Sequence, residues 1–299
     1  MTNRWWVYQK ERFPIFAHGP MVIIFCLSIM LFSSLQEGAL PGIARITGAV
    51  ITTLILFFQL RVADEFKDFE DDSKYRPHRA VPRGLISLRE LAWAAWIGAA
   101  VQFVIAVRID VGLVPLLIIV WLYMGLMTRE FFVPGWLKRT PSVYLTSHML
   151  IMPMIAFYVS AFDWLCDCRA MPAGLGWLLL FSFACGLVLE IGRKIKAPDA
   201  ERNGVETYSS AWGIGGALAA WVAASIISVV AFVLASTVLE NTIVPINMGV
   251  GLLALALILA GVMPATGGPR ISTRFVEPGS GLFAMLLYLG LGPLQALVV

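Results

Sequence analysis

The chain has 299 residues, of which 59% are hydrophobic or aromatic and only 14% are charged, with a formal net charge of +3. Soluble domains contain roughly 45–50% apolar residues and about 25% charged residues. These proportions exclude an ordinary soluble enzyme, a disordered chain and a protein that binds nucleic acid. The four cysteines are too few and too dispersed to form a zinc site or a disulfide framework.

Long apolar runs follow one another along the chain, separated by short polar segments. A bilayer core of about 30 Å is crossed by about 20 helical residues, and only helices or closed barrels satisfy the backbone in lipid. The runs do not alternate, so they predict helices. We therefore expect an all-α integral membrane protein in which residues 1–299 form a single membrane-embedded domain. The nine predicted transmembrane helices cover residues 17–35, 45–63, 88–107, 111–127, 141–161, 173–191, 209–236, 246–263 and 278–298.

Lysine and arginine are distributed unequally between the two sides that nine crossings define. The side that holds the N-terminus carries 19 of these residues, and the other side carries only Arg45, Arg108 and Arg169. Cytoplasmic loops of membrane proteins are enriched in lysine and arginine. The division therefore predicts a cytoplasmic N-terminus in a cell's inner (cytoplasmic) membrane, and it supports the span count.

The segment after the second span, RVADEFKDFEDDSKYRPHRAVPRG, is dense in acids that are followed at once by bases. If the span continues as a helix, Asp64, Asp68 and Asp72 lie at i, i+4 and i+8 and share one face. Such carboxylates repel one another, and Mg²⁺ offsets the repulsion because it binds one or two carboxylates together with substrate phosphates. Arg76 and Arg79 suit bidentate contacts with phosphate. The segment predicts a metal–diphosphate site, and a solvated loop is the alternative.

A second polar segment, LEIGRKIKAPDAERNGVETYSSAWG, follows the sixth span. Its acids and bases are Glu190 at the end of the apolar run, Arg193 and Lys194 one turn later, and then Asp199 and Glu201. Two acidic clusters that face each other can hold two or more Mg²⁺ ions across one diphosphate. The alternative is a surface loop with ion pairs at helical spacing.

These segments resemble the signature motifs of the UbiA superfamily of intramembrane prenyltransferases. The first family motif, NDxxDxxxD, precedes an RPxRP-like stretch and a glycine, and this chain reads DEFKDFEDD and then RPHRAVPRG. Asp68 and Asp72 match the metal-binding aspartates of the family, whereas Asp64 stands where asparagine is usual. Arg76 and Arg79 match the basic stretch.

The chain departs from the family pattern at two places. The second family motif, DxxxD after the sixth helix, is absent, and the acids available there are Glu190, Asp199 and Glu201. A Tyr-xxx-Lys near the end of the fourth helix is half present, because Tyr123 is in place and Met127 occupies the lysine position. Three nearby bases could supply the missing charge: Arg129, Lys138 or Arg139.

The resemblance implies a Mg²⁺-dependent transfer of a prenyl group from a prenyl diphosphate to an aromatic or other lipophilic acceptor, with release of pyrophosphate, at the cytoplasmic side of the bundle. The implied catalytic residues are Asp68, Asp72 and Arg79. The implied metal ligands are Asp64, Asp68, Asp72, Glu190, Asp199 and Glu201. The residues implied to bind the diphosphate and its metal ion are Asp64, Arg76, Tyr123, Lys138, Arg193 and Lys194.

Two rival functions stay open at this point. An intramembrane terpene cyclase of the same superfamily would ionise the same substrate and close it on itself. A transporter or lipid-binding membrane protein is the rival from another class, although span interiors nearly free of charge argue against ion-coupled transport. His148, a polar residue within the fifth span, fits either a contact with the acceptor or a helix–helix hydrogen bond. The sequence does not indicate the prenyl chain length or the oligomeric state.

Overall fold

The computed structural model of the chain describes residues 3–38, 40–201, 205–239, 243–266 and 273–297. Within these ranges the chain forms thirteen α-helices and four short 3₁₀ helices, and it forms no strand. Arg202 and Arg270, two of the bases counted on the cytoplasmic side, lie outside the described residues. The helices are α1 (Arg4–Arg12), α2 (Ile15–Ser34), α3 (Ile43–Lys67), α4 (Phe69–Tyr75), α5 (Leu88–Ile109), α6 (Leu113–Thr128), α7 (Pro134–Arg139), α8 (Pro141–Met149), α9 (Ile151–Trp164), α10 (Leu175–Arg193), α11 (Tyr208–Ser236), α12 (Ile243–Thr266) and α13 (Val276–Leu291).

Every predicted span coincides with an apolar helical segment. Six segments among the described residues are long and apolar enough to cross a membrane: Ile15–Glu37, Ile43–Lys67, Leu88–Ile109, Pro141–Trp164, Leu175–Arg193 and Tyr208–Ser236. Three more are apolar but shorter: Leu113–Thr128, Pro245–Ala260 and Val276–Leu291. The 16 residues of α6 extend about 24 Å at 1.5 Å per residue, less than a bilayer core of about 30 Å. The chain is therefore an all-helical integral membrane protein, and the count of nine crossings stays a prediction.

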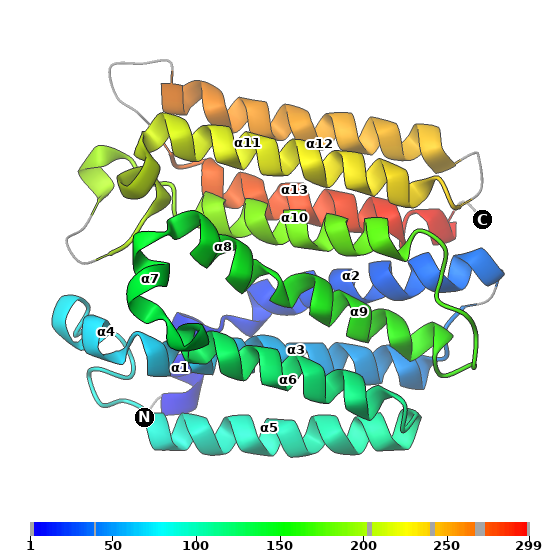
Figure 1. Cartoon of the computed structure of the whole chain (residues 1–299), viewed down its shortest axis with the longest axis horizontal. Coiled ribbons are helices and arrows are strands. Elements are labelled where there is room, and N and C mark those ends of the chain that lie inside the picture. Colours follow the sequence, from blue (N-terminus) through cyan, green and yellow to red (C-terminus); the bar gives the residue numbers. More distant parts are fainter. Residues whose placement is uncertain (1–2, 39, 202–204, 240–242, 267–272, 298–299) are drawn as a thin grey trace.

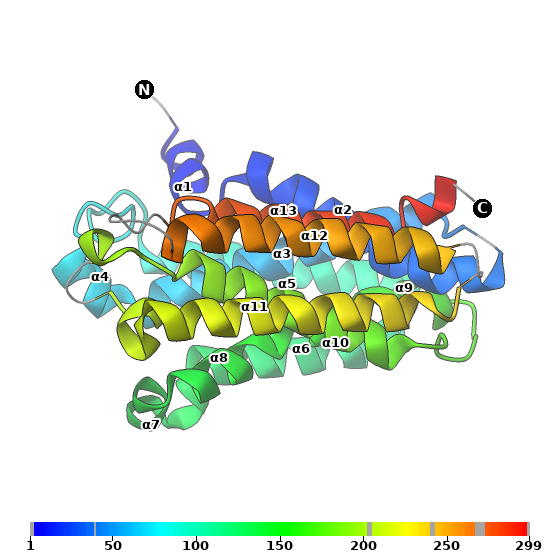
Figure 2. The same ribbon diagram turned by 90° about the horizontal axis from the view of Figure 1, so that it is seen from above.

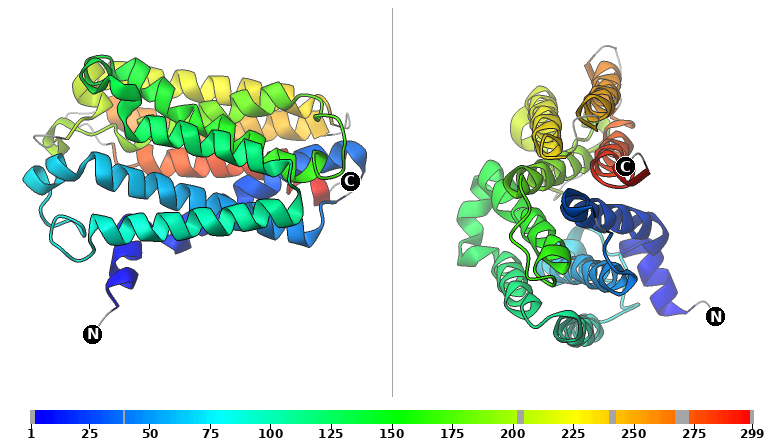
Figure 3. Two further views of the ribbon diagram at one scale, coloured as in Figure 1. Left: turned by 60° about the horizontal axis from the view of Figure 1, so that its bottom comes forward. Right: turned by 90° about the vertical axis from the view of Figure 1, so that its right-hand side faces the viewer.

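The long helices lie side by side along one common direction (Figure 1). Helices α1, α4 and α7 gather at one end, which we call the polar end, and the C-terminal segment lies at the opposite end (Figures 1 and 2). In the end-on view of Figure 3, α11, α12 and α13 lie together on one side of α10, and α3, α5 and α6 lie on the other side. The bundle thus has two groups of helices with α2, α9 and α10 between them.

The core and the outer surface of the bundle are both apolar. Large aromatic side chains from four helices are fully buried in the core: Phe32 of α2, Phe162 of α9, Phe181 of α10 and Phe283 of α13. At the periphery, α5 leaves Trp93 and Trp96 largely exposed. Helices that are apolar on every side are typical of a membrane protein, because their outer faces meet lipid.

Three local breaks in the helices position the site. Helix α3 ends at Lys67, and Asp68 has non-helical dihedral angles before α4 begins. The fifth predicted span is divided into α8 and α9, because Pro153 has no N–H for the Met149 carbonyl and its ring crowds that carbonyl. Helix α11 turns at Gly213, whose φ of +70° is favourable only for glycine.

Candidate active site

Two adjoining cavities lie near the polar end of the bundle. The outer cavity, of about 260 Å³, is lined mainly by α2, α3, α10 and α13, and the inner cavity, of about 190 Å³, is lined mainly by α3, α6, α8 and α10. Met149 of α8 and Met152 of α9 contribute to both. Residues that line both cavities are Phe57, Leu60, Asp64, Met149, Met152, Glu190 and Arg193. The two cavities are therefore parts of one space, which we call the chamber.

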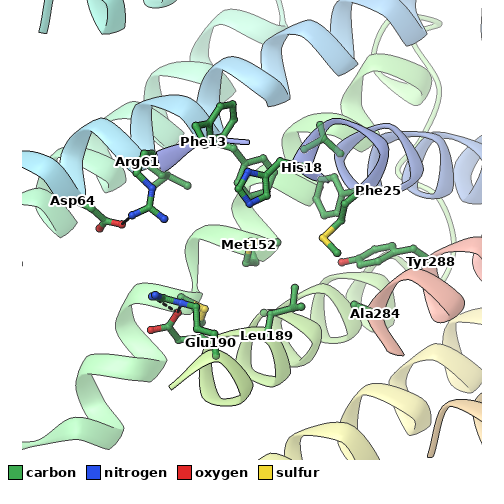
Figure 4. A pocket seen from close by; sticks show the side chains of 17 residues that line it. Phe13, His18, Phe25, Arg61, Asp64, Met152, Leu189, Glu190, Ala284 and Tyr288 are labelled. Carbon is green, nitrogen blue, oxygen red and sulfur yellow. Dashed lines mark hydrogen bonds and ion pairs between the residues drawn. The ribbon is translucent and has the colours of Figure 1, made fainter. Parts of the chain in front are cut away.

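Asp64 of α3 and Glu190 of α10 lie on opposite sides of the chamber (Figure 4). Each is paired with cations on its own helix: Arg61 lies 3.3 Å from Asp64, and Arg193 and Lys194 lie 2.7 Å and 3.1 Å from Glu190. The structure thus brings one acid from each of the two polar segments to a common space. Away from these acids and their cations the outer cavity is mostly apolar, with Phe25, Leu189, Ala284 and Tyr288 among its side chains and His18 as its polar member (Figure 4).

The expectation that Asp64, Asp68 and Asp72 form one ladder on a continuous helix is wrong. The Asp68 backbone N–H still donates to the Asp64 carbonyl at 2.9 Å, but α3 ends at Lys67 and the non-helical dihedral angles of Asp68 take α4, and with it Asp72, out of the register of Asp64. The Asp68 side chain is 42% exposed, and its nearest cation is Lys67, 4.0 Å away. Partial burial raises the pKa of Asp68, and the Lys67 ammonium opposes this rise.

Asp72 lies in a separate network of arginines. Its side chain is almost fully buried and accepts hydrogen bonds from Arg76 at 3.0 Å and from Arg79 at 2.6 Å. Arg12 of the N-terminal segment lies 3.9 Å from the same carboxylate and 2.5 Å from buried Glu65. Neither Asp72 nor these arginines line the chamber. In this structure Asp72 therefore holds the arginines of the motif in place.

The other predicted site residues lie away from the chamber. Asp199 is exposed, and Glu201 accepts hydrogen bonds of 2.7 Å and 2.9 Å from the Thr207 hydroxyl. Lys138 and Asp71 form a long, largely exposed ion pair at 3.8 Å. The Tyr123 hydroxyl donates to the Ser147 carbonyl, and its ring lines an apolar cavity of about 390 Å³ between α6, α9 and α10.

Lys67 is a chamber residue that the sequence reasoning missed. Its ammonium donates a hydrogen bond of 2.5 Å to the Tyr144 hydroxyl and lies 5.1 Å from the centre of the Tyr144 ring. Lys67 lines the inner cavity together with Met127, the residue at the family's lysine position. The one sequence signal for Lys67 was its position directly before Asp68. Its contact with Tyr144 could not be predicted, because the two residues are 77 positions apart in the sequence. Lys67 thus contributes a positive charge to the cavity that Met127 also lines.

Lys194 lies next to the chamber residue Glu190, although it does not itself line either cavity. Its ammonium lies 5.5 Å from the Tyr144 ring centre and 5.4 Å from the Tyr208 ring centre, besides its ion pair with Glu190. The Tyr208 ring stacks on Trp212, with 4.6 Å between the centroids. Aromatic faces stabilise cations electrostatically. These rings therefore fix Lys194 at the polar end of α10.

Carboxylate oxygens are the candidate ligands for the Mg²⁺ ion that the sequence predicts. Within the described residues, no three His, Cys, Asp or Glu side chains are grouped closely enough to form a metal site by themselves. Asp64 and Glu190 nevertheless offer hard oxygen ligands to a shared space. Mg²⁺ is commonly bound by one or two carboxylates while substrate phosphates and waters complete its shell. The residues present therefore fit a Mg²⁺ ion that is bound together with a diphosphate.

The chain belongs to the UbiA prenyltransferase family, whose model matches residues 21–276. This match confirms the resemblance drawn from the two polar segments, which both lie inside the matched range. No match was found among proteins of curated function.

Solved structures share the fold along almost the whole chain. The apo structure of a UbiA homologue from Aeropyrum pernix K1 has a TM-score of 0.70 at 14% identity, covering 93% of this chain and 98% of that one. A digeranylgeranylglyceryl phosphate synthase structure has a TM-score of 0.63 at 16% identity, with coverage of 98% and 99%. A UbiA homologue from Archaeoglobus fulgidus bound to DMAPP and Mg²⁺ has a TM-score of 0.58 at 12% identity, with coverage of 91% and 97%. Because these sequence identities are low, the structural likeness establishes the fold alone.

Proposed function

We propose that this chain transfers a prenyl group from a prenyl diphosphate to a lipophilic acceptor and releases pyrophosphate. The observation that carries the proposal is the chamber itself, where Asp64 and Glu190, with their paired arginines, stand opposite each other at the end of a mostly apolar cavity. A diphosphate with a long hydrocarbon tail has the same division between a charged head and an apolar body. Family membership supports the proposal, as does the homologue that binds DMAPP and Mg²⁺.

The residues of the chamber divide into those that face the diphosphate and those that face the prenyl chain. Asp64 and Glu190, with Asp68 at the break after α3, would hold Mg²⁺, which when bound neutralises charge on the diphosphate oxygens. Lys67 and Arg193 add positive charge on the two sides of this head group. The apolar residues of the outer cavity exclude water from the prenyl chain. Asp72, Arg76 and Arg79 form the neighbouring network that supports this arrangement.

The reaction that we propose is a substitution at the allylic carbon of the prenyl diphosphate. The bond between this carbon and the diphosphate oxygen breaks, and its electron pair leaves with pyrophosphate. An electron pair of the acceptor forms the new bond to the same carbon, and the acceptor loses a proton. Preorganised positive charge accelerates the step because it stabilises the negative charge that builds on the leaving group.

We also infer the placement of the chain in the membrane. The three shorter apolar helices are taken as crossings, which gives nine spans and a single membrane-embedded domain over residues 1–299. Arg45 and Arg169 pair with acids at the end of the bundle opposite the chamber, and they belong to the minority of bases that the charge count places outside. This supports a cytoplasmic N-terminus, a site on the cytoplasmic side and residence in a cell's inner membrane.

A pyrophosphate-release assay on the purified chain in detergent tests the proposal. Geranyl, farnesyl and geranylgeranyl diphosphates are supplied with Mg²⁺ or with EDTA, with and without aromatic or quinone-type acceptors, and products are identified by mass spectrometry. We expect Mg²⁺-dependent release that requires an acceptor. A cyclic product formed without any acceptor would replace the proposal with a terpene cyclase, and no release under any condition would contradict both.

A further inference from the structure

A row of aromatic side chains bounds the outer cavity at the end away from its acids. Phe57 of α3, Phe25 of α2 and Tyr288 of α13 all line this cavity, and Figure 4 shows Phe25 and Tyr288 on the side away from Asp64. The ring centroids of Phe57 and Phe25 lie 6.3 Å apart, and those of Phe25 and Tyr288 lie 5.3 Å apart. We call these three residues the aromatic floor.

The Tyr288 side chain extends the aromatic floor to α10, the fourth of the helices that mainly line the outer cavity. Its hydroxyl donates a hydrogen bond of 3.2 Å to the Ser182 hydroxyl, which in turn donates to the Met152 carbonyl of α9 at 3.4 Å. The fully buried Phe181 ring, which does not line the chamber, packs against Tyr288 with 4.7 Å between the centroids. Tyr288 is only 4% exposed and Phe25 only 3%. The Tyr288 ring is therefore held in place across the cavity.

The helices around the outer cavity form a closed ring. Going around it, α2, α3, α9, α10 and α13 each pack against the next, and α13 packs against α2. At the level of the chamber, Met152 of α9 lies against Gly186 of α10, and Met21 of α2 lies against Gly281 of α13. The cavity between α6, α9 and α10 shares no lining residue with the chamber. An apolar chain that enters beside the acids therefore runs toward the aromatic floor.

Two helices give the distance from the acids to the aromatic floor. On α3, Asp64 and Phe57 are seven residues apart, which corresponds to about 10.5 Å at 1.5 Å per residue. On α10, Glu190 and the Tyr288 partner Ser182 are eight residues apart, or about 12 Å. An extended isoprene unit is about 5 Å long, because it adds four carbon–carbon bonds to a chain. Two such units therefore reach from the acids to the aromatic floor.

We infer that the aromatic floor restricts this chain to short prenyl diphosphates, with the two-unit geranyl group as the longest that fits in an extended form. Tyr288 is the specificity residue, because a third isoprene unit meets its ring. That unit gains no burial in the chamber unless it displaces closely packed core side chains, and either outcome costs affinity. The inference rests on the proposed function and adds to it the class of prenyl donor.

Helix α13 offers two substitutions that move this limit in opposite directions. Ala284 also lines the outer cavity and stands one turn before Tyr288, about 6 Å nearer the acids. Ala284→Leu therefore shortens the space by about one isoprene unit, and Tyr288→Ala lengthens it by about as much. Tyr288→Phe keeps the ring and is the matched control. Phe162→Ala, which removes a fully buried ring outside both cavities, controls for a general loss of packing.

Binding of unreactive substrate analogues tests the inference without catalysis. In prenyl S-thiolodiphosphates, sulfur replaces the oxygen between the prenyl carbon and the diphosphate, which slows cleavage of that bond. The dimethylallyl, geranyl and farnesyl analogues are titrated with Mg²⁺ into the full chain in detergent, and calorimetry gives each Kd. Longer analogues partition into detergent micelles, so the ratio of two Kd values is compared between variants, where this partition cancels.

The two α13 variants should change these ratios in opposite ways. We expect Tyr288→Ala to favour the farnesyl over the geranyl analogue at least tenfold more than wild type does, because the third isoprene unit becomes buried. Ala284→Leu should disfavour geranyl relative to dimethylallyl by at least tenfold, and this variant decides alone if Tyr288→Ala does not fold. Tyr288→Phe and Phe162→Ala should keep the wild-type ratios. Equal ratios in all variants would overturn the inference, since the prenyl chain would then leave the chamber between helices.

The same titrations separate this inference from the proposed function. A wild-type chain that transfers prenyl groups but shows the same Kd ratios in every variant contradicts the chain-length limit alone. A chain that binds the analogues and transfers nothing contradicts the proposed function, and its Kd ratios still decide the role of Tyr288. Failure of all the analogues to bind the wild-type chain contradicts both.

Discussion

At the scale of single residues, the acids that face the chamber are paired with cations of their own helices. Arg61 stands three residues before Asp64, and Arg193 and Lys194 stand three and four residues after Glu190. Such local pairs reduce the cost of placing carboxylates at the ends of membrane helices. We expect the same cations to turn toward the phosphate oxygens of a bound substrate, because a diphosphate brings more negative charge than a carboxylate.

Removal of either chamber carboxylate should abolish most of the activity. Asp64→Asn and Glu190→Gln keep the shape of the side chain but remove the negative charge that would hold Mg²⁺. We expect Mg²⁺-dependent pyrophosphate release to fall by about a hundredfold or more in each variant. Glu201→Gln, outside the chamber, is the matched control and should stay close to wild type. Activity near the wild-type rate in both chamber variants would contradict the assignment of the site.

Lys67 should act on the diphosphate rather than on folding. Lys67→Met removes the buried ammonium from the inner cavity, and a hydrogen bond to a charged group is worth about 1.5–3 kcal/mol. We therefore expect the KM for the prenyl diphosphate to rise roughly tenfold to a hundredfold. Lys138→Met removes an exposed lysine that pairs only with Asp71 at 3.8 Å, so it serves as the control. If both variants raise the KM equally, a general loss of positive charge explains the effect.

Asp72 should affect both activity and stability, because it is buried among arginines. Asp72→Asn leaves Arg76 and Arg79 without their carboxylate, and breaking a buried ion pair costs about 3–5 kcal/mol. We expect a lower thermal midpoint in detergent together with strongly reduced turnover. Asp71→Asn, one residue earlier and 62% exposed, should change neither measurement. A variant at Asp72 that keeps its thermal midpoint but loses turnover would instead place this carboxylate at the metal.

At the scale of elements, α1 is attached by ion pairs to the first polar segment and to the start of α5. Arg4 lies 2.6 Å from Glu90, Arg83 lies 2.8 Å from Glu11, and Arg12 lies 2.5 Å from Glu65. The first two pairs are partly exposed, and such pairs contribute only about 0–1 kcal/mol. The third is buried, and Arg12 also approaches Asp72. The attachment of α1 therefore depends on Arg12.

Arg12→Met and Arg4→Met test this difference. We expect Arg12→Met to lower the thermal midpoint by several degrees and to reduce turnover, because buried Glu65 loses its partner. Arg4→Met should lower the midpoint little, since its ion pair is exposed. Thermal unfolding in detergent, followed at low and high salt, measures both effects. Equal shifts in the two variants would show that α1 is held by its apolar contacts instead.

The helices could be predicted from the sequence far better than their breaks. Apolar runs predicted each long helical segment, because lipid requires the whole backbone to bond within the helix, but not the short polar helices α1, α4 and α7. The end of α3 at Lys67 could not be read from the acids, since an i, i+4 spacing persists whether or not the helix continues. Pro153 lies inside the fifth predicted span, and membrane helices can tolerate a proline. The structure nevertheless divides this span just before Pro153. Periodicity thus located the helices but not their ends.

The site could be predicted in part for a similar reason. Asp64 and Glu190 were found because acids at the ends of apolar runs are costly and need a partner. Asp199 and Glu201 were included only because no nearer acids followed Glu190, and the structure places neither in the chamber. Lys67 was missed because its significance depends on Tyr144, which lies on a different helix. Contacts between distant helices are properties of packing, and local spacing does not record them.

At the scale of the whole molecule, the two ends of the bundle differ in their charges. The chamber, α1 and α4 occupy the polar end, where most of the described bases lie. At the opposite end Arg45 pairs with Asp167 at 2.6 Å, and Arg169 pairs with buried Asp163 at 2.8 Å. Pairing with Arg45 lowers the pKa of Asp167. Two of the three bases at this end, Arg45 and Arg169, are therefore neutralised locally, which strengthens the charge asymmetry that orients the chain.

Cysteine labelling tests both the orientation and the crossing by the short helix α6. Cys168 is exposed in the connection between α9 and α10, whereas Cys26 and Cys185 are buried, so Cys166→Ser leaves one accessible thiol. In a second variant both loop cysteines are replaced and exposed Ser73 of α4 becomes the labelled site as Ser73→Cys. An impermeant maleimide should label Cys168 in intact cells, and Ser73→Cys only after permeabilisation.

The two positions are separated by α5, α6 and the α8–α9 pair. Since α5 and the α8–α9 pair are each long enough to cross a membrane, the two positions lie on opposite sides only if α6 crosses as well. Labelling of both positions from the same side would mean that α6, about 24 Å long, does not cross the bilayer. The reverse pattern, with Ser73→Cys accessible in intact cells, would keep the crossings but place the chamber on the outer side. A site on that side could not use a cytoplasmic supply of prenyl diphosphate, so the same labelling experiment also bears on the proposed substrate.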